Sequence, residues 1–444
     1  MKEKRTISTL SPDKYRAQLR LLDDAARKVL SSGFSRQTPA DRVLAGYFRQ
    51  NHRCGSRDRA FISETVYALL RYWGFLRLYL PQERRTELES GSIRLTAREL
   101  AALLMAAAFI HDNGDNAEII AAVHHMEPLP RSLNNPTARA NQMATYFGCE
   151  LKLTDRDLLP EWIYAELPAN LDISGYLRLL AQRPPMWIRL QCDDPNEVYA
   201  ELTALGAIME RHPVLTDAVA VRMQTNLFSL ETYRNGKFEI QDLASQCVSI
   251  AAAPNQGERW LDPCAGAGGK SLHLAQLMNR KGSVTAGDIR AAKLDDLRRR
   301  ARRAGFPNII TKPHDGGAWK GRHQFDGVLV DAPCSCSGVW RRNPGAQWKL
   351  QLENISELAA TQRKILENYA HAVRPGGVLV YATCSLFDAE NSAVVRNFLS
   401  GHPEYKLDPF PHPLNGKIVP GMVRIDSIDG DCDALFVAKM RKVQ

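Results

Sequence analysis

The chain has 444 residues, of which 44% are hydrophobic and 24% charged, and this composition excludes wholesale disorder. The length predicts two to four domains, because a single hydrophobic core stops growing near roughly 250–300 residues. Fifty-eight Lys and Arg residues against 49 Asp and Glu residues give a formal charge of +9. This charge favours polyanionic partners such as nucleic acids, although a soluble basic enzyme would also fit.

Neither a membrane span nor a secretory signal is visible in the sequence. The longest nearly unbroken apolar run, residues 100–110, is far shorter than the roughly 18–20 residues that a bilayer requires. The nine cysteines include no Cys-x-x-Cys pair, so we predict reduced thiols with neither a disulfide framework nor a metal site. In particular, Cys334 and Cys336 lack further ligands at metal-site spacing. We expect a cytoplasmic monomer with no membrane partner.

The first part of the chain, residues 1–150, is expected to form an all-helical domain. Apolar residues recur there at three- and four-residue intervals, and Ser11 or Thr96 could cap a helix start. The helical pattern covers residues 13–30, 56–80 and 96–110. Residues 151–240 are expected to form a small α+β domain. Its predicted elements are strands at 186–192 and 218–223 and a helix at 196–209.

Residues 241–444 alternate short apolar strands with longer helices, and a glycine turn commonly joins the two. Such alternation predicts a doubly wound α/β domain with a parallel sheet and right-handed crossovers. The strand-to-helix pairs are 259–269 with 271–279, 283–289 with 291–305, 325–333 with 355–373, and 377–385 with 390–400. Segments 422–426 and 435–440 would add edge strands.

A run of small residues follows the first of these strands and forms a candidate cofactor loop. The loop comprises Cys264, Ala265, Gly266, Ala267, Gly268, Gly269 and Lys270. It matches neither the Walker loop nor the dinucleotide fingerprint, and a tight structural turn is the alternative. Asp288 ends the next strand about twenty residues later, where an acid commonly binds ribose hydroxyls. Together they favour S-adenosylmethionine over NAD, and Asp315 could meet the adenine unless it is only a loop carboxylate.

Two cysteines follow the ends of two later strands. Cys334 lies in the segment 331–335 (Asp-Ala-Pro-Cys-Ser) and Cys384 in the segment 383–385 (Thr-Cys-Ser). If these strands are neighbours, about 4.8 Å apart, both thiols open into one crevice. A buried, inert thiol is the alternative for each.

These segments resemble the RNA cytosine-C5 methyltransferases of the RsmB or Sun type. The resemblance rests on the cofactor loop, on Asp-Ala-Pro-Cys-Ser, on Ala-Thr-Cys-Ser followed by Glu390-Asn391, and on residues 238–246. It implies a Rossmann-like methyltransferase domain preceded by a small RNA-binding domain. It also implies that Cys384 is the nucleophile, that Cys334 assists product release, and that Asp288, Asp315 and Asp331 lie at the cofactor or target base.

Residues 20–80 resemble the NusB-like helical domain of the same enzymes, which implies ribosomal RNA as the substrate. Transfer RNA, an inactive RNA-binding assembly or antitermination factor, and a DNA methyltransferase with Cys334 as nucleophile remain alternatives. Aromatic and basic residues at 339–344 and Trp348 are expected to contact RNA. A second basic cluster, either an RNA contact or a solvated helix face, comprises Arg290, Lys293, Arg298, Arg299, Arg300, Arg302 and Arg303.

The sequence departs from the family pattern at a few positions. Ala267 replaces the proline that is common in the cofactor loop, and residues 433–436 read Asp-Ala-Leu-Phe rather than Asp-Gly-Phe-Phe. Cys336 stands where glycine is usual and adds a third thiol to which the resemblance assigns no role.

Overall fold

The computed structural model describes residues 12–35, 38–89, 94–223 and 225–443, so the predicted cap at Ser11 lies outside the described residues. The chain forms two compact units. The first comprises Met1–Ala165, Asp172–Arg183 and Trp340–Leu350, and the second comprises Glu166–Leu171, Pro184–Val339 and Gln351–Gln444.

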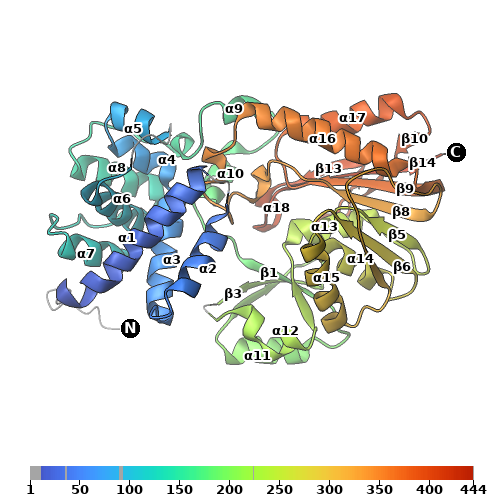
Figure 1. The fold of residues 1–444 in the computed structure, drawn as a ribbon, viewed down its shortest axis with the longest axis horizontal. Coiled ribbons are helices and arrows are strands. Elements are labelled where there is room, and N and C mark those ends of the chain that lie inside the picture. The colour runs from blue at the N-terminus through green and yellow to red at the C-terminus, as the bar shows by residue number, and fades with distance from the viewer. Residues whose placement is uncertain (1–11, 36–37, 90–93, 224, 444) are drawn as a thin grey trace. The chain divides into compact units, whose positions relative to one another are not determined.

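The first unit is built from helices (Figure 1). Up to residue 183 the helices are α1 (Pro12–Ser35), α2 (Ala40–Gln50), α3 (Ser56–Arg71), α4 (Trp73–Leu76), η2 (Arg77–Tyr79), α5 (Gln82–Glu89), α6 (Ala97–Ile110), α7 (Gly114–Val123), α8 (Pro136–Tyr146), η3 (Asp155–Leu158), α9 (Ile163–Glu166) and α10 (Ile173–Leu180). The apolar run of the sequence lies in α6, which is almost wholly buried. A capping box starts this helix, since Thr96 accepts from the Glu99 amide and Glu99 accepts from the Thr96 amide.

The segment Trp340–Leu350, with η6 (Ala346–Trp348), packs inside this first unit. Trp340 and Arg341 are each 1% exposed, and the Arg77 guanidinium lies 4.6 Å from the Trp348 ring centroid. Arg341 Nε donates to the Leu179 carbonyl at 3.0 Å. The prediction that this segment offers aromatic and cationic side chains to RNA is therefore wrong for Trp340 and Arg341, which are core residues.

The second unit contains an eight-stranded sheet in the order β10-β14-β9-β8-β5-β6-β7, with β13 also paired to β14. Its strands are β5 (Arg259–Asp262), β6 (Ser283–Asp288), β7 (Ile309–Pro313), β8 (Phe325–Asp331), β9 (Val373–Thr383), β10 (Tyr405–Leu407), β13 (Met422–Ile425) and β14 (Leu435–Lys442). Strands β5 to β9 are parallel and β14 is antiparallel to β9. The predicted Rossmann-like α/β core is confirmed, but β14 lies inside the sheet instead of at its edge.

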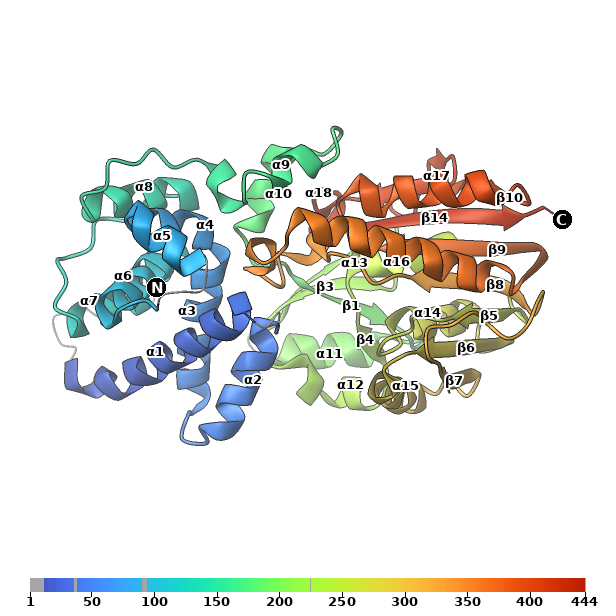
Figure 2. The ribbon, with the colours of Figure 1, turned by 45° about the horizontal axis from the view of Figure 1, so that its top comes forward.

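Helices cover both faces of this sheet (Figure 2). They are α13 (Leu243–Ala252), α14 (Gly269–Leu277), α15 (Ala291–Ala304), α16 (Leu352–Ala370), α17 (Ser392–Gly401) and α18 (Ser427–Gly430), with short turns η5 (Ser337–Val339) and η7 (Asp388–Glu390). Alternate residues of β8 enter different cores, since Leu329 packs with α13–α15 whereas Val328 and Val330 pack with α16 and α17. The chain leaves β5 for β6 and β7 and returns on its other side as β8, so strand order reverses at β5.

A smaller antiparallel sheet in the order β2-β3-β1-β4 belongs to the same unit. Its elements are β1 (Met186–Leu190), α11 (Asn196–Ala204), β2 (Ile208–Arg211), β3 (Ala218–Arg222), η4 (Leu227–Ser229), α12 (Glu231–Arg234) and β4 (Phe238–Ile240); a separate hairpin pairs β11 (Phe410–Pro411) with β12 (Ile418–Val419). The predicted helix at 196–209 ends early, because Gly206 adopts a φ of 71° and the chain turns into β2.

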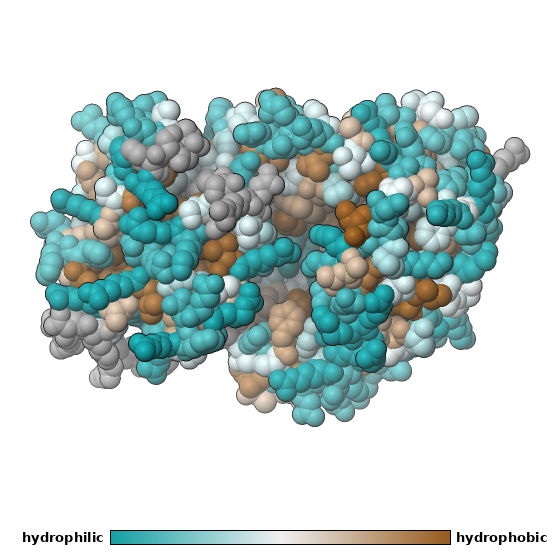
Figure 3. Space-filling model, in the orientation of Figure 1, coloured by the Kyte–Doolittle hydropathy of each residue, from teal (hydrophilic) through white to brown (hydrophobic). Residues whose placement is uncertain are grey.

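The surface is mostly hydrophilic on the face drawn in Figure 3, where apolar side chains are scattered among polar ones. Among the described helices, none is long and apolar enough to span a membrane.

Candidate active site

The candidate cofactor loop joins β5 to α14 at the point where strand order reverses. Gly268 has a φ of 88°, and a Cβ there would lie 2.4 Å from the Leu297 side chain of α15, so only glycine fits. The Gly266 amide donates to Asp288 Oδ2 at 2.9 Å and the Ala265 amide donates to the Gly287 carbonyl at 2.8 Å. The loop is therefore fixed against the end of β6.

Asp288 is a buried carboxylate at that strand end. Burial acts to raise its pKa, but hydrogen bonds from Arg290 and Gly266 outweigh burial and hold the pKa below its ordinary value. Asp288 is therefore ionised at neutral pH and its oxygens can accept hydrogen bonds from ligand hydroxyls. The contact with ribose hydroxyls that the sequence predicts for Asp288 stays a prediction.

A second carboxylate at the base of the loop was not predicted as a site residue. Asp262, 1% exposed, ends β5 and accepts from the Ser271 hydroxyl at 2.6 Å. Its Oδ1 has no hydrogen-bond partner among the described residues. Burial raises the pKa of Asp262 to about 7. The open acceptor, Asp262 Oδ1, lies at the base of the glycine loop, and the ionised Asp288 ends the neighbouring strand. This combination fits a nucleoside-containing, positively charged cofactor such as S-adenosylmethionine.

Lys270 connects the loop to the end of β8. Its Nζ lies 2.8 Å from Asp331 Oδ2. Burial opposes its charge, but the Asp331 carboxylate raises the pKa of Lys270 above its ordinary value. The sequence placed both residues at the site without indicating that they form an ion pair.

Asp315 is exposed and lies in a turn after β7, where its Oδ1 accepts from the Gly317 amide at 2.9 Å. Backbone hydrogen bonds lower the pKa of this carboxyl. The neighbouring His314 ring holds the turn near the cofactor loop through a 2.8 Å hydrogen bond to the Pro263 carbonyl. The Asp315 side chain thus closes its own turn by accepting from a backbone amide two residues later. Its predicted contact with adenine stays a prediction.

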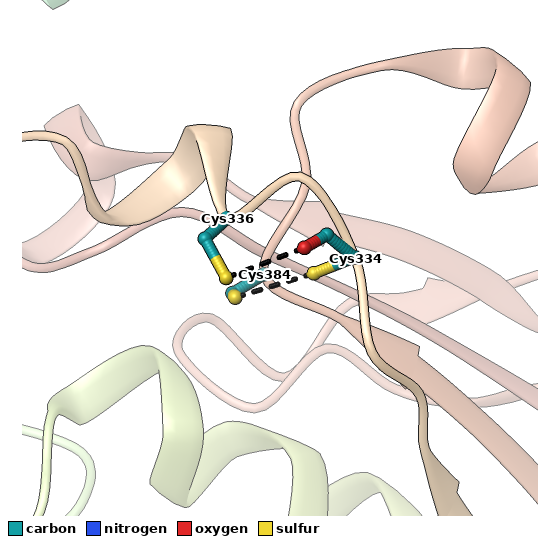
Figure 4. Close-up of side chains that lie close together, drawn as sticks. All are labelled: Cys334, Cys336 and Cys384. Carbon is teal, nitrogen blue, oxygen red and sulfur yellow. Dashed lines mark hydrogen bonds between the residues drawn. The ribbon is translucent and has the colours of Figure 1, made fainter. Parts of the chain in front are cut away.

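The two predicted cysteines lie side by side (Figure 4). Parallel pairing of β8 with β9, with Asp331 opposite Ala382, places Cys334 Sγ 3.4 Å from Cys384 Sγ. Both thiols are half-buried, and the exposed Cys336 completes a group whose three sulfur atoms lie within 4.8 Å of one another. The structure therefore brings together Cys334, Cys384 and a third thiol that the sequence left without a role.

The three thiols titrate as a group. Hydrogen bonds from Cys334 and Cys384 hold the pKa of Cys336 below its ordinary value. The same hydrogen bonding, together with burial, raises the pKa of Cys334. The bond with Cys334 acts to lower the pKa of Cys384, but Cys336 and burial outweigh it and raise this pKa.

Glu390 ties together the loops that carry these cysteines. This side chain is fully buried and accepts from the Ser335 amide at 2.9 Å, from the Ser335 and Ser385 hydroxyls at 2.5 Å each, and from Gln362 at 2.9 Å. The sequence noted Glu390 only as a companion of a motif, and nothing local indicated that it joins two strand ends.

The Arg-rich face of α15 is largely engaged within the protein. Arg300 donates to the Ala267 carbonyl at 2.7 Å and, with Arg303, pairs with the buried Glu239 of β4. Arg298 and Arg299 pair with Asp295 and Asp296 on the same helix. Arg300 thus supports the cofactor loop, which is a role that charge patterning alone did not predict.

Residues 249–441 match the model of a family described as 16S rRNA methyltransferase RsmB/F. Ribosomal RNA small subunit methyltransferase B of Yersinia pestis bv. Antiqua (strain Angola) is 35% identical over 293 residues, and the probable ribosomal RNA small subunit methyltransferase B of Bacillus subtilis (strain 168) is 31% identical over 299 residues. Each alignment covers 64% of this chain and 66% of the relative. The chain thus spans just under two thirds of the length of these relatives.

Two solved structures share the fold. PH0851 aligns over 99% of this chain and 100% of its own, with a TM-score of 0.72 and 22% identity. NSun6 from Pyrococcus horikoshii with SFG aligns over 64% of this chain and 98% of its own, with a TM-score of 0.55 and 20% identity. At these identities the likeness shows the fold alone.

Proposed function

We propose that the protein methylates carbon 5 of a cytosine in ribosomal RNA, because residues 249–441 match the model of a family described as 16S rRNA methyltransferase RsmB/F. S-adenosylmethionine is the methyl donor and supplies an electrophilic methyl group when bound. The observation that carries the proposal is the 3.4 Å separation of Cys334 Sγ and Cys384 Sγ at neighbouring strand ends. Transfer RNA is the alternative substrate.

The chemistry requires a nucleophile, because carbon 5 of cytosine is too electron-poor to accept a methyl group directly. The Cys384 thiolate adds to carbon 6, and the ring electrons move to make carbon 5 nucleophilic. Asp331, whose Oδ2 lies 2.8 Å from Lys270 Nζ, pairs with ring nitrogen 3 of the base and stabilises the adduct. This pairing requires one proton, carried either by the carboxyl group or by ring nitrogen 3. Once carbon 5 is methylated, Cys334 in its thiolate form accepts the proton of carbon 5. The electrons of that C–H bond reform the double bond between carbons 5 and 6, and Cys384 leaves carbon 6 as a thiolate.

The remaining parts of the chain present the substrate in this proposal. Residues 1–150 are assigned to a NusB-like helical domain, residues 151–240 to a small RNA-binding domain and residues 241–444 to the methyltransferase domain. The compact units differ from these bounds, because residues 151–165, 172–183 and 340–350 pack with the helical unit and the small sheet begins after residue 184. The target cytosine must be unstacked to reach the thiols, at a cost of a few kcal/mol in a duplex. Support comes from the net charge of +9, which favours an RNA partner.

A methyl-transfer assay tests this function. We expect the protein to transfer label from S-adenosylmethionine to ribosomal RNA at carbon 5 of cytosine, and Cys384→Ala to abolish the transfer. Label in transfer RNA alone would identify the other substrate. Absence of label from every RNA would instead favour a binding factor without catalysis, and activity that survives Cys384→Ala would remove the assigned nucleophile.

A further inference from the structure

Cys336 adds a third sulfur atom to the pair already described. Cys334 and Cys336 flank one residue in the loop after β8, and Cys384 follows β9 (Figure 4). Along the sequence, Cys334 and Cys336 have no further metal ligand at suitable spacing, but the pairing of β8 with β9 brings Cys384 to them from 48 residues away. All three Sγ atoms lie within 4.8 Å of one another.

The spacing of the sulfur atoms suits a thiophilic ion. A Zn–S bond of about 2.3 Å in a tetrahedral site requires sulfur atoms about 3.8 Å apart. The cluster contains one pair at 3.4 Å and no pair beyond 4.8 Å, so shifts of roughly one ångström or less reach this spacing. We propose that Cys334, Cys336 and Cys384 bind a soft divalent ion of the Zn²⁺ class through three thiolates.

The loop that carries Cys336 is held in place before any ion binds. Its Cys334 carbonyl accepts from Cys336 Sγ at 3.4 Å, and the Cys336 carbonyl accepts from the Val339 amide at 3.1 Å. The Gly338 amide donates to the Cys384 carbonyl at 2.8 Å, which joins the two cysteine loops directly. A fixed loop loses little conformational freedom on ion binding, which favours affinity.

The exposure of the three residues leaves one side of the cluster open. Cys336 is exposed, whereas Cys334 and Cys384 are half-buried, so an ion enters from solvent and keeps a fourth position for water. Soft thiolate ligands select Zn²⁺ over Mg²⁺ or Ca²⁺. Each thiol that binds as a thiolate releases its proton, so binding releases up to three protons and weakens as pH falls.

Ion binding has a consequence that rests on the proposed function. The ion occupies both the nucleophile Cys384 and its partner Cys334, so cytosine cannot add to the thiolate while the ion is bound. The site is therefore inhibitory and reversible. Cys336 gives the cluster its third ligand, and the proposed methyl transfer assigns no bond-forming step to it.

The binding test uses the full-length protein, reduced and freed of metal, and titrates Co²⁺ as a spectroscopic probe followed by Zn²⁺ in competition. The key variant is Cys336→Gly, because glycine suits the φ of 57° at this position. The matched control, Cys149→Ser, removes a half-buried thiol from the other unit. We expect wild type and control to bind one ion with thiolate-to-cobalt charge transfer, and Cys336→Gly to lose at least about 100-fold in affinity. Equal affinity in Cys336→Gly, or no charge transfer in wild type, would overturn the site.

The inhibition test measures methyl transfer to ribosomal RNA with and without Zn²⁺. We expect Zn²⁺ to inhibit wild type and Cys149→Ser, whereas Cys336→Gly keeps most of its own metal-free activity when Zn²⁺ is added. Equal inhibition of Cys336→Gly would overturn the inhibitory role. If metal-free wild type transfers no methyl group, the proposed function fails, and the binding titration still decides the metal site by itself.

Discussion

Asp262 is the residue whose charge is most strongly affected by its surroundings near the cofactor loop. It is fully buried, its Oδ1 has no partner among the described residues, and its pKa of about 7 lies well above the roughly 3.9 of an unfolded chain. Between these two values the folded state binds more protons than the unfolded state. Stability therefore falls as pH rises across this window.

Replacement of Asp262 by Asn tests this linkage. The neutral amide cannot ionise, so the free energy of unfolding of the variant relative to wild type should rise by about 3 kcal/mol between pH 5 and pH 8. Urea unfolding at the two pH values measures the change. Asp315→Asn is the control, because that carboxylate is exposed and its pKa is lowered, so its charge is constant over this range. An unchanged difference for Asp262→Asn would show that the buried carboxyl is not protonated near neutral pH.

Among the elements, the two strand ends that carry the cysteines depend on one side chain. Glu390 of η7 accepts from the loops after β8 and β9 and from Gln362 of α16. No cysteine contacts Glu390 in the hydrogen bonds of the described residues, so its role is to position the loops.

Glu390→Gln should lower the rate of methyl transfer about 10- to 100-fold, because the amide nitrogen faces donors and about 1–3 kcal/mol of hydrogen bonding is lost. The KM for S-adenosylmethionine should stay unchanged, since the cofactor loop makes none of these bonds. Steady-state kinetics separates the two effects, and Glu357→Gln on the exposed face of α16 is the control. A raised KM with an unchanged kcat would contradict the positioning role.

Local sequence patterns predicted most of the α/β unit. The predictions failed where contacts between residues far apart in the sequence determine the structure. The spacing of apolar residues and the turn-forming glycines predicted the glycine loop and the positions of Asp288, Cys334 and Cys384 at or after strand ends. The internal place of β14 depends on pairing with β9, which no local pattern encodes. Trp340 and Arg341 have the composition of an RNA-contacting segment, yet Arg341 donates to the Leu179 carbonyl of the chain's own helix α10. Composition alone cannot distinguish a cationic side chain that contacts RNA from one that donates to carbonyls of its own chain.

At the scale of the whole molecule, the two compact units are not consecutive segments of the chain. Residues 340–350 belong to the helical unit although the residues on either side belong to the α/β unit. Arg71 holds the segment 340–350 within the helical unit, because its buried guanidinium donates to the carbonyls of Leu180, Gln182 and Arg341 at 2.9–3.0 Å. Burial lowers the pKa of Arg71 to about 10, so it stays charged at neutral pH.

Arg71→Leu should leave these three carbonyls without their donor and destabilise the helical unit by about 3 kcal/mol or more. The segment 340–350 should then open, and trypsin should cleave after Arg341 or Arg342. Limited proteolysis and thermal unfolding measure both effects, with Arg53→Leu at an exposed position as the control. Resistance to trypsin equal to that of wild type would show that Arg71 does not hold the segment.

The central claim is that Cys384 bonds to the pyrimidine and Cys334 is needed to break that bond. The direct measurement is denaturing gel electrophoresis of Cys334→Ala incubated with ribosomal RNA and S-adenosylmethionine. We predict a slowly migrating protein–RNA adduct that disappears when Cys384 is also replaced by alanine. An adduct that persists in the double variant, or forms with Cys384→Ala alone, would contradict the account.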